Sequence, residues 1–230
     1  MNDERLAPVT AVRVWDLPTR LFHWALVVGV SGSLVTALIG GNAMVWHFRC
    51  GFAIFTLLLF RLLWGVKGGR WSRFVSFAYA PSTLARYLRG QHRPDEHLDV
   101  GHSPLGSLSV FALLAVLAVQ VGSGLFADDE ISNVGPLNRF VSNDRAADLT
   151  GWHTEFGPWI IGALVLLHIA AITFYVGYRK RKLVRAMISG DKALSAATPA
   201  SADSAASRLF ALILLLICAA VVRWLVSFGG

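Results

Sequence analysis

Two histidines lie in one long apolar stretch of the sequence, LTGWHTEFGPWIIGALVLLHIAAITFY, at residues 149–175. His153 and His168 are fifteen residues apart, so in a helix their rings would be separated by about 22 Å along the axis but only about 60° around it. An imidazole inside a membrane helix is costly unless it is paired or bound to another group. Two histidines on one helix face at opposite depths therefore predict two partners.

Two further histidines lie where such partners are needed. His23 is near the start of an earlier apolar stretch, and His47 is near the start of the next one. If consecutive stretches cross a membrane in alternate directions, His23 lies at the depth of His168. By the same reasoning, His47 lies at the depth of His153.

Facing imidazoles between helices satisfy both axial positions of a haem iron, whereas two imidazoles leave a zinc ion short of ligands. The spacing thus favours two bis-histidine haem sites. Structural histidines or a proton path remain the alternative interpretation.

The elements that must position these histidines are apolar spans. Of the 230 residues, 55% are hydrophobic and 15% are charged, against about a quarter charged in an average soluble domain. Five spans are long enough for a hydrocarbon core of about 30 Å, and their apolar character is continuous, which favours helices over barrel strands. We expect an all-α membrane protein, a four-helix transmembrane bundle holding two haems plus a fifth C-terminal transmembrane helix. The expected spans are residues 21–39, 44–64, 105–126, 151–175 and 209–228.

The chain divides by composition into four parts. We expect a cytoplasmic N-terminal segment at 1–20, a di-haem domain at 21–182, a linker at 183–207 and an accessory helix at 208–230. The run ALSAATPASADSAAS within the linker is typical of flexible chain. Cys50 and Cys218 each lie in an apolar span, so they are expected to be small buried residues without a disulfide.

The net charge of +7 is distributed in a way that indicates a membrane protein and not a nucleic-acid partner. Basic residues collect in segments that alternate spans place on one side, and the opposite loops carry few. The loop at 127–150 has five acidic residues and two basic ones. The positive-inside rule then predicts a multi-pass membrane protein with a cytoplasmic N terminus and a C terminus on the opposite side.

Several other residues could serve a cofactor. Arg49 and Arg61 could pair with haem propionates, although simple snorkelling would equally explain Arg61. His102, in GHSPLG at the mouth of the third span, could contact a propionate or a quinone, or cap the start of the helix. His92 and His97 lie in a hydrophilic loop and are expected to be solvated.

Small residues near the expected ligands could leave gaps for a flat cofactor. Ordinary close contact between helices would explain such residues as well. The glycines concerned are Gly51, Gly122, Gly124, Gly157 and Gly162.

Four motifs taken together resemble a known family. They are VWDLPTRLFHW at 14–24, the histidine that opens the second span, GHSPLG at 101–106, and H-x3-G-x-W-x8-H at 153–168. Over about residues 12–182 the chain resembles the bacterial cytochrome b-561 family, which includes the b-type subunits of nickel-iron hydrogenases. The resemblance implies a four-helix core with two b haems whose iron ligands are His23, His47, His153 and His168.

The leading functional hypothesis is transfer of electrons across the inner membrane between a quinone pool and a periplasmic partner, such as a c-type cytochrome, a dehydrogenase or a hydrogenase. The alternative is a self-contained superoxide:quinone-type oxidoreductase. Arg49, Arg139 and Arg145 could attract an anion, although five nearby acids weaken that case. A haem-free transporter is disfavoured because no span has a broken-helix pattern.

Overall fold

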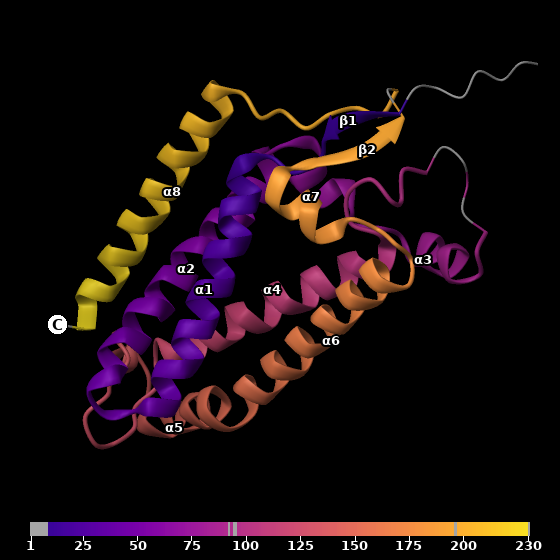
Figure 1. The fold of residues 1–230 in the computed structure, drawn as a ribbon. Helices are drawn as coiled ribbons and strands as arrows, with labels where there is room; N and C mark the ends of the chain where they lie inside the picture. The colour runs from indigo at the N-terminus through magenta and orange to yellow at the C-terminus, as the bar shows by residue number, and fades with distance from the viewer. Residues whose placement is uncertain (1–8, 92, 94–95, 196, 230) are drawn as a thin grey trace, which may run out of the picture. The chain divides into compact units, whose positions relative to one another are not determined.

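The computed structural model describes residues 9–91, 93, 96–195 and 197–229. Each of its five long apolar helices is long and apolar enough to cross a membrane, which confirms the expected all-α membrane architecture (Figure 1). His92 and the first eight residues of the expected N-terminal segment lie outside the described residues. The helices are α1 (Leu17–Ile39), α2 (Met44–Lys67), α4 (Pro104–Gly124), α6 (Gly157–Gly177) and α8 (Ala205–Val226).

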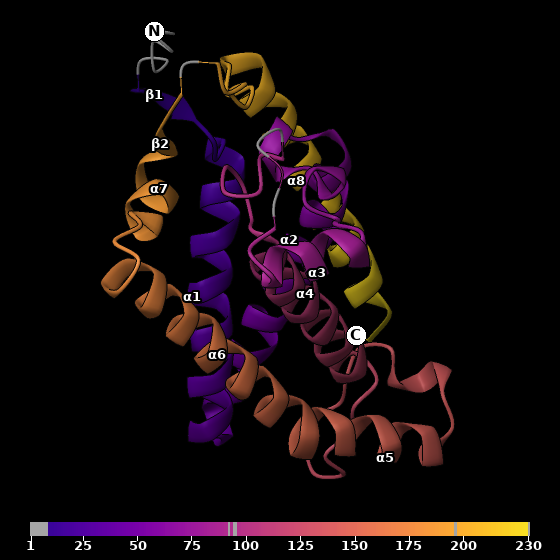
Figure 2. The same ribbon diagram turned by 90° about the vertical axis from the view of Figure 1, so that its right-hand side faces the viewer.

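Three of the helical spans, those of α1, α6 and α8, begin at least four residues earlier than the apolar runs suggest. α1 begins at Leu17, and the Asp16 side chain accepts a hydrogen bond from the Thr19 backbone N–H at 2.8 Å. The fourth span starts at α5 (Asn143–Gly151), continues through a π-helical turn, η5 (Trp152–Phe156), and runs on as α6 (Figure 2). Side-chain caps of this kind satisfy backbone donors at a helix start.

A two-stranded antiparallel sheet, which the sequence did not predict, joins distant parts of the chain. β1 (Val9–Arg13) pairs with β2 (Asp191–Ser195), with Arg13 opposite Asp191. The same two side chains form an ion pair at 3.0 Å. α7 (Leu183–Ser189) leads into β2 through Gly190, whose φ of 91° favours glycine.

The structure corrects the expectation of a flexible linker. The Ser201 hydroxyl is buried, donates to the Val14 carbonyl at 2.7 Å and accepts from the Trp71 N–H at 3.2 Å. The Trp71 indole donates to the Pro199 carbonyl at 2.8 Å. Serine and alanine are small, so the backbone approaches its neighbours closely enough for these bonds to form.

Short helices complete the connections. Gly40 and Gly41 have positive φ values of 68° and 52°, which close the tight turn between α1 and α2. The connection between α2 and α4 contains α3 (Pro81–Leu88), with proline in its first turn. The 3-10 turns are η1 (Gly41–Ala43), η2 (Arg70–Ser72), η3 (Phe74–Ser76), η4 (Asn138–Phe140) and η6 (Ser227–Gly229).

The chain forms two compact units. Unit 1 comprises Met1–Leu21, Leu63–Leu108 and Ala170–Ala211. Unit 2 comprises Phe22–Leu62, Ser109–Ile169 and Leu212–Gly230, and it contains all four of the predicted ligand histidines. Its apolar core is Ile54, Leu58 and Leu117.

A fully buried carboxylate holds unit 1 together. Besides the Thr19 N–H, the Asp16 carboxylate accepts from the Trp64 indole at 3.1 Å and from the Ser72 hydroxyl at 2.6 Å. A Cβ at Gly69 would lie 2.4 Å from an Asp16 oxygen, so glycine is needed there. These bonds join the start of α1 to the end of α2 and to η2.

We expect Asp16→Ala to lower the stability of the protein by about 2–4 kcal/mol, because it leaves the buried Trp64 and Ser72 donors without an acceptor. Asp191→Ala is the matched control, since it removes a half-exposed carboxylate whose ion pair is worth at most about 1 kcal/mol. Thermal unfolding in detergent, followed by circular dichroism, measures both. Equal midpoints for the two variants would show that the Asp16 network has no special role.

Candidate functional site

The rings of His47 and His153 face each other within unit 2. Their centroids are 5.9 Å apart and their planes are nearly perpendicular, at 86°. His47 lies in the first turn of α2, and His153 lies in the π-helical turn η5, a distortion that often occurs at functional sites. Imidazole–metal bonds of about 2.0–2.1 Å would put two axial rings about 6 Å apart. The spacing therefore fits one metal centre between the rings.

Hydrogen bonds fix which nitrogen each of these rings can offer. His47 Nδ1 lies 2.9 Å from the Ser33 carbonyl oxygen, and His153 Nδ1 lies 2.8 Å from the Gln120 carbonyl oxygen. A carbonyl can only accept, so each Nδ1 carries the proton and donates. Each Nε2 then keeps its lone pair, which is the arrangement of metal-binding histidines.

The α4 helix shapes the surroundings of His153. The Gln120 side chain donates to the His153 carbonyl at 2.8 Å, and the Ser123 hydroxyl lies 3.4 Å from Nδ1. A Cβ at Gly124 would lie 2.6 Å from a ring carbon of His153. Residues of α4 thus contact His153 at its backbone carbonyl, at Nδ1 and at the edge of its ring.

The other two histidines also belong to unit 2. His23 is within electrostatic range of His168, and its ring lies edge-on to that of Trp24 at 5.0 Å. The Nδ1 atom of His23 is buried and has no hydrogen-bond partner among the described residues. A buried imidazole of this kind is suited to holding a further group.

The packing around the histidines leaves room for a flat group. Gly51 follows His47 by one helical turn, on the same face of α2, and no atom lies within 4 Å of where its Cβ would be. Gly122 and Gly162 likewise face open space. Gly124 instead contacts His153, and a Cβ at Gly157 would meet the Gln120 side chain. Three of the five glycines therefore fit the expected gaps.

The donor set suits haem better than a free ion. In the part of the chain that the structure describes, no three or more His, Cys, Asp or Glu side chains gather as a metal site. A zinc ion at the His47–His153 pair would be left with two protein ligands, whereas haem iron needs only two axial ones. Cys50 and Cys218 are free cysteines.

The two arginines differ in their positions. Arg61 is buried, at 3% exposure, with its guanidinium 6.0 Å from the ring of Phe22, the neighbour of His23. A buried cation near His23 is suited to the carboxylate of a bound group. Arg49 is exposed, and its guanidinium stacks on the Trp46 ring at 4.7 Å. Because Arg49 follows His47 by two positions in α2, its side chain points away from the His47 ring.

His102 lies in unit 1 and packs between two aromatic rings. Its centroid is 4.7 Å from that of Trp15 and 4.4 Å from that of Phe77. Lys192 Nζ donates to the Val100 carbonyl at 2.7 Å and lies within hydrogen-bond range of the Asp99 and Gly101 carbonyls. Burial lowers the pKa of Lys192 to about 8, and its bonds hold the segment that leads to His102.

Tyrosines and an exposed histidine lie in the same part of the chain. The Tyr79 hydroxyl donates to the His102 carbonyl at 2.8 Å. Burial raises the pKa of Tyr87 to about 12, and Tyr87 also bonds to Tyr175. His97 is exposed, as expected, with its ring 6.0 Å from that of Trp71.

The 127–150 loop of unit 2 is ordered by its own side chains. Asp129 accepts three backbone N–H bonds, from residues 131–133, and one from the Asn133 side chain. These bonds, the Asn133 side chain first, hold the pKa of Asp129 well below its usual range. The loop therefore keeps this negative charge throughout the physiological range.

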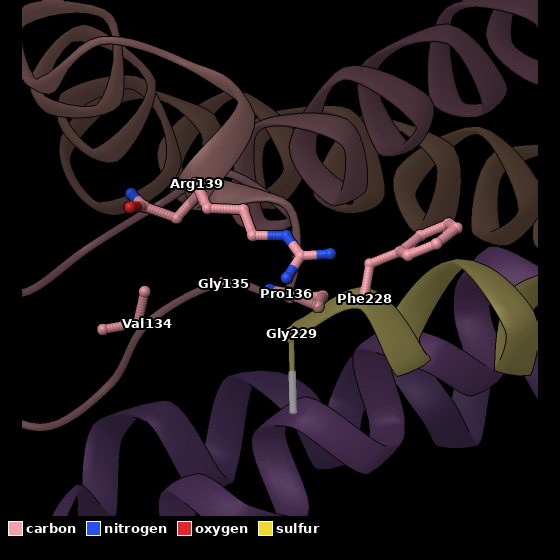
Figure 3. Close-up of a pocket in the computed structure, with 7 residues that line it drawn as sticks. Val134, Gly135, Pro136, Arg139, Phe228 and Gly229 are labelled. Carbon is pink, nitrogen blue, oxygen red and sulfur yellow. The ribbon is translucent and has the colours of Figure 1, made fainter.

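A small cavity of about 180 Å³ lies where this loop meets the end of α8. Gly135 and Pro136 form one side of it, and the Arg139 guanidinium lies 5.9 Å from the Phe228 ring (Figure 3). The volume is smaller than the 300–1,000 Å³ typical of a small-molecule pocket.

Sequence reasoning missed the residues that hold the histidines. Ser33 and Gln120 bond to them, and Ser123 lies beside one. The available signal was a polar side chain inside an apolar span at the depth of a histidine, which in a membrane is a functional indication.

Comparison with known proteins identifies the family of this chain. The family described as Prokaryotic cytochrome b561 matches residues 14–190. The Probable Ni/Fe-hydrogenase 1 B-type cytochrome subunit of Escherichia coli K12 is 25% identical over 190 residues, covering 68% of this chain and 80% of that protein. The Probable Ni/Fe-hydrogenase B-type cytochrome subunit of Azotobacter chroococcum is 25% identical over 227 residues, covering 82% and 91%.

A similarly named subunit of Cupriavidus necator is 23% identical over 217 residues, covering 79% of this chain and 87% of that protein. No solved structure matches the chain. The family match spans most of the chain, including all four span histidines and the described helices that carry them. The chain therefore belongs to the prokaryotic cytochrome b561 family, and is a multi-pass membrane cytochrome that binds b-type haem and transfers electrons.

Proposed function

We propose that the chain binds two b-type haems and carries electrons across a bacterial inner membrane, between a quinone pool and a periplasmic redox partner. The observation that carries the proposal is the 5.9 Å approach of the His47 and His153 rings, with each Nδ1 directed at a backbone carbonyl. The proximity of His23 to His168 supports a second site.

In this proposal His47 and His153 would hold one haem, and His23 and His168 would hold the other. Bound haem iron supplies reversible one-electron chemistry. The Ser33 and Gln120 carbonyls keep the Nδ1 protons in place, which orients each ring and makes its Nε2 more basic. Arg61 provides a buried positive charge for a propionate, while the exposed Arg49 is the weaker candidate for that role.

The charge distribution supports an orientation with the N terminus in the cytoplasm and the C terminus in the periplasm. The His47–His153 site then lies toward the periplasm and the His23–His168 site toward the cytoplasm. The acidic 127–150 loop lies on the periplasmic side, where its charge would steer a basic partner. A c-type cytochrome or a dehydrogenase would suit this position.

The names of the relatives favour one kind of partner. They are B-type cytochrome subunits of Ni/Fe hydrogenases, so we include a hydrogenase among the dehydrogenases that could exchange electrons with this chain. Two features of the chain could contact such a partner, the acidic 127–150 loop and the α8 helix.

We place quinone exchange near His102, on the cytoplasmic side. The buried Trp15 and Phe77 rings provide an apolar environment, and His102, which is half-buried, provides a polar ring next to both. Such a combination is typical of small-molecule sites, in which few polar groups orient a mainly apolar ligand.

One observation favours the alternative function of superoxide:quinone oxidoreductase. Arg139 is exposed beside the 180 Å³ cavity, which suits a small anion better than a quinone. The loop that carries Arg139 also carries five acidic residues, and their repulsion of an anion makes electron transfer with a protein partner the better-supported function.

Purified protein is expected to contain about two haems per chain, and acid acetone should extract both, because the sequence lacks the C-x-x-C-H motif for covalent attachment. A pyridine haemochrome assay measures the content. One haem per chain, or haem that stays with the protein after extraction, would contradict the proposal.

Removing either member of a histidine pair should remove the same haem. His47→Ala and His153→Ala are expected to lose one redox component, and His23→Ala and His168→Ala the other, because each haem needs both axial ligands. Redox titration of each variant followed by absorbance tests this pairing. His97→Ala, at an exposed histidine, is the matched control and should keep both redox components. If the His23 and His47 variants lost the same redox component, the pairing would be wrong.

Replacing His102 should impair reaction with quinol and leave haem content intact. We expect His102→Phe, which preserves stacking between Trp15 and Phe77, to raise KM for a quinol analogue about tenfold, the cost of one hydrogen bond. Stopped-flow haem reduction in detergent measures the effect, with His97→Ala as control. An unchanged KM would move the quinone site away from His102.

A further inference from the structure

A groove of about 810 Å³ in unit 2 is lined by residues of α2 and α8. Its volume lies in the range of small-molecule sites, about 300–1,000 Å³. Small side chains at Ala53, Ala219 and Ala220 leave the hollow. The other lining residues are Phe52, Thr56, Val222, Arg223, Trp224, Val226 and Ser227.

The hydroxyl groups in this groove are already satisfied. Thr56 donates to the Phe52 carbonyl at 2.9 Å, and Ser227 donates to the Trp224 carbonyl at 2.7 Å. None of the described residues that line the groove is acidic. Its surface is therefore apolar apart from one cation.

That cation is Arg223. It is exposed, and it has no hydrogen bond or ion pair with any residue in the described part of the chain. It lies three residues before the end of α8, about 4.5 Å along the axis, so it is near the membrane–water boundary. Arg49 precedes Ala53 by four residues and so lies on the same α2 face, one turn nearer that boundary.

The α8 wall of the groove is held in place by the 127–150 loop. The Phe228 ring lies 6.0 Å from the Phe140 ring, and a Cβ at Gly229 would lie 2.4 Å from Pro136. Figure 3 shows Phe228 and Gly229 beside this loop. The groove is thus formed before any ligand enters.

We propose that this groove binds an anionic phospholipid, with an acyl chain along the alanines and the phosphate at Arg223. The occupant follows from charge complementarity, since an apolar channel leads to a cation at headgroup depth and contains no counter-charge. A quinone carries no negative charge to match Arg223. If Arg223 only extended its side chain into water, the groove would not distinguish lipid headgroups.

Native mass spectrometry of the purified protein tests this, using phosphatidylglycerol and phosphatidylcholine with the same acyl chains. We expect phosphatidylglycerol to bind about fivefold more tightly, the effect of one basic residue near the surface. Arg223→Gln should abolish this preference, and Ala220→Phe, which fills the groove, should weaken binding of both lipids. Arg145→Gln is the matched control, because Arg145 is an exposed arginine on α5.

Unchanged haem content shows that each variant is folded. Headgroup glycerol phosphate without chains is expected not to compete, which separates a lipid from a free phosphate. The proposal is overturned if Arg223→Gln keeps the preference, if both lipids bind the parent protein equally, or if a quinone displaces phosphatidylglycerol from the groove.

Discussion

Polar atoms in a helix that crosses a membrane must find their partners within the protein, because the hydrocarbon core offers no water. The ring nitrogens of His47 and His153 meet this requirement through carbonyls of neighbouring helices. A helical carbonyl has a second lone pair available after its own helix bond. The rings are therefore oriented by backbone atoms, whose positions are set by the packing of whole helices.

The same requirement organises unit 1, where a buried carboxylate and a half-buried ammonium each take several partners. The Asp16 carboxylate binds one backbone and two side-chain donors, and the Lys192 ammonium binds the carbonyls before His102. In each case the charge binds a segment far from it in the sequence. These two charges thus fix the loops that connect the spans.

The sequence was sufficient for features that depend on local composition. Continuous apolar runs located all five helices, and the depth of each histidine correctly indicated that His47 would meet His153. Features that depend on contacts between distant segments were not accessible. The β1–β2 pairing and the buried Ser201 fall in this class, because no local pattern encodes them. The π-helical turn at His153 was also missed, since WHTEF has no distinctive composition.

The pairing of β1 with β2 has a consequence for the order in which the chain folds. Arg13 and Asp191 are opposite each other in the sheet, so nearly 180 residues separate the two strands. At about 5–20 residues per second, synthesis of that length takes about 10–40 s. During this time β1 has no partner strand, although α1 can already enter the membrane. The N-terminal strand therefore pairs only after four of the five long helices have been made, even though that strand is made first.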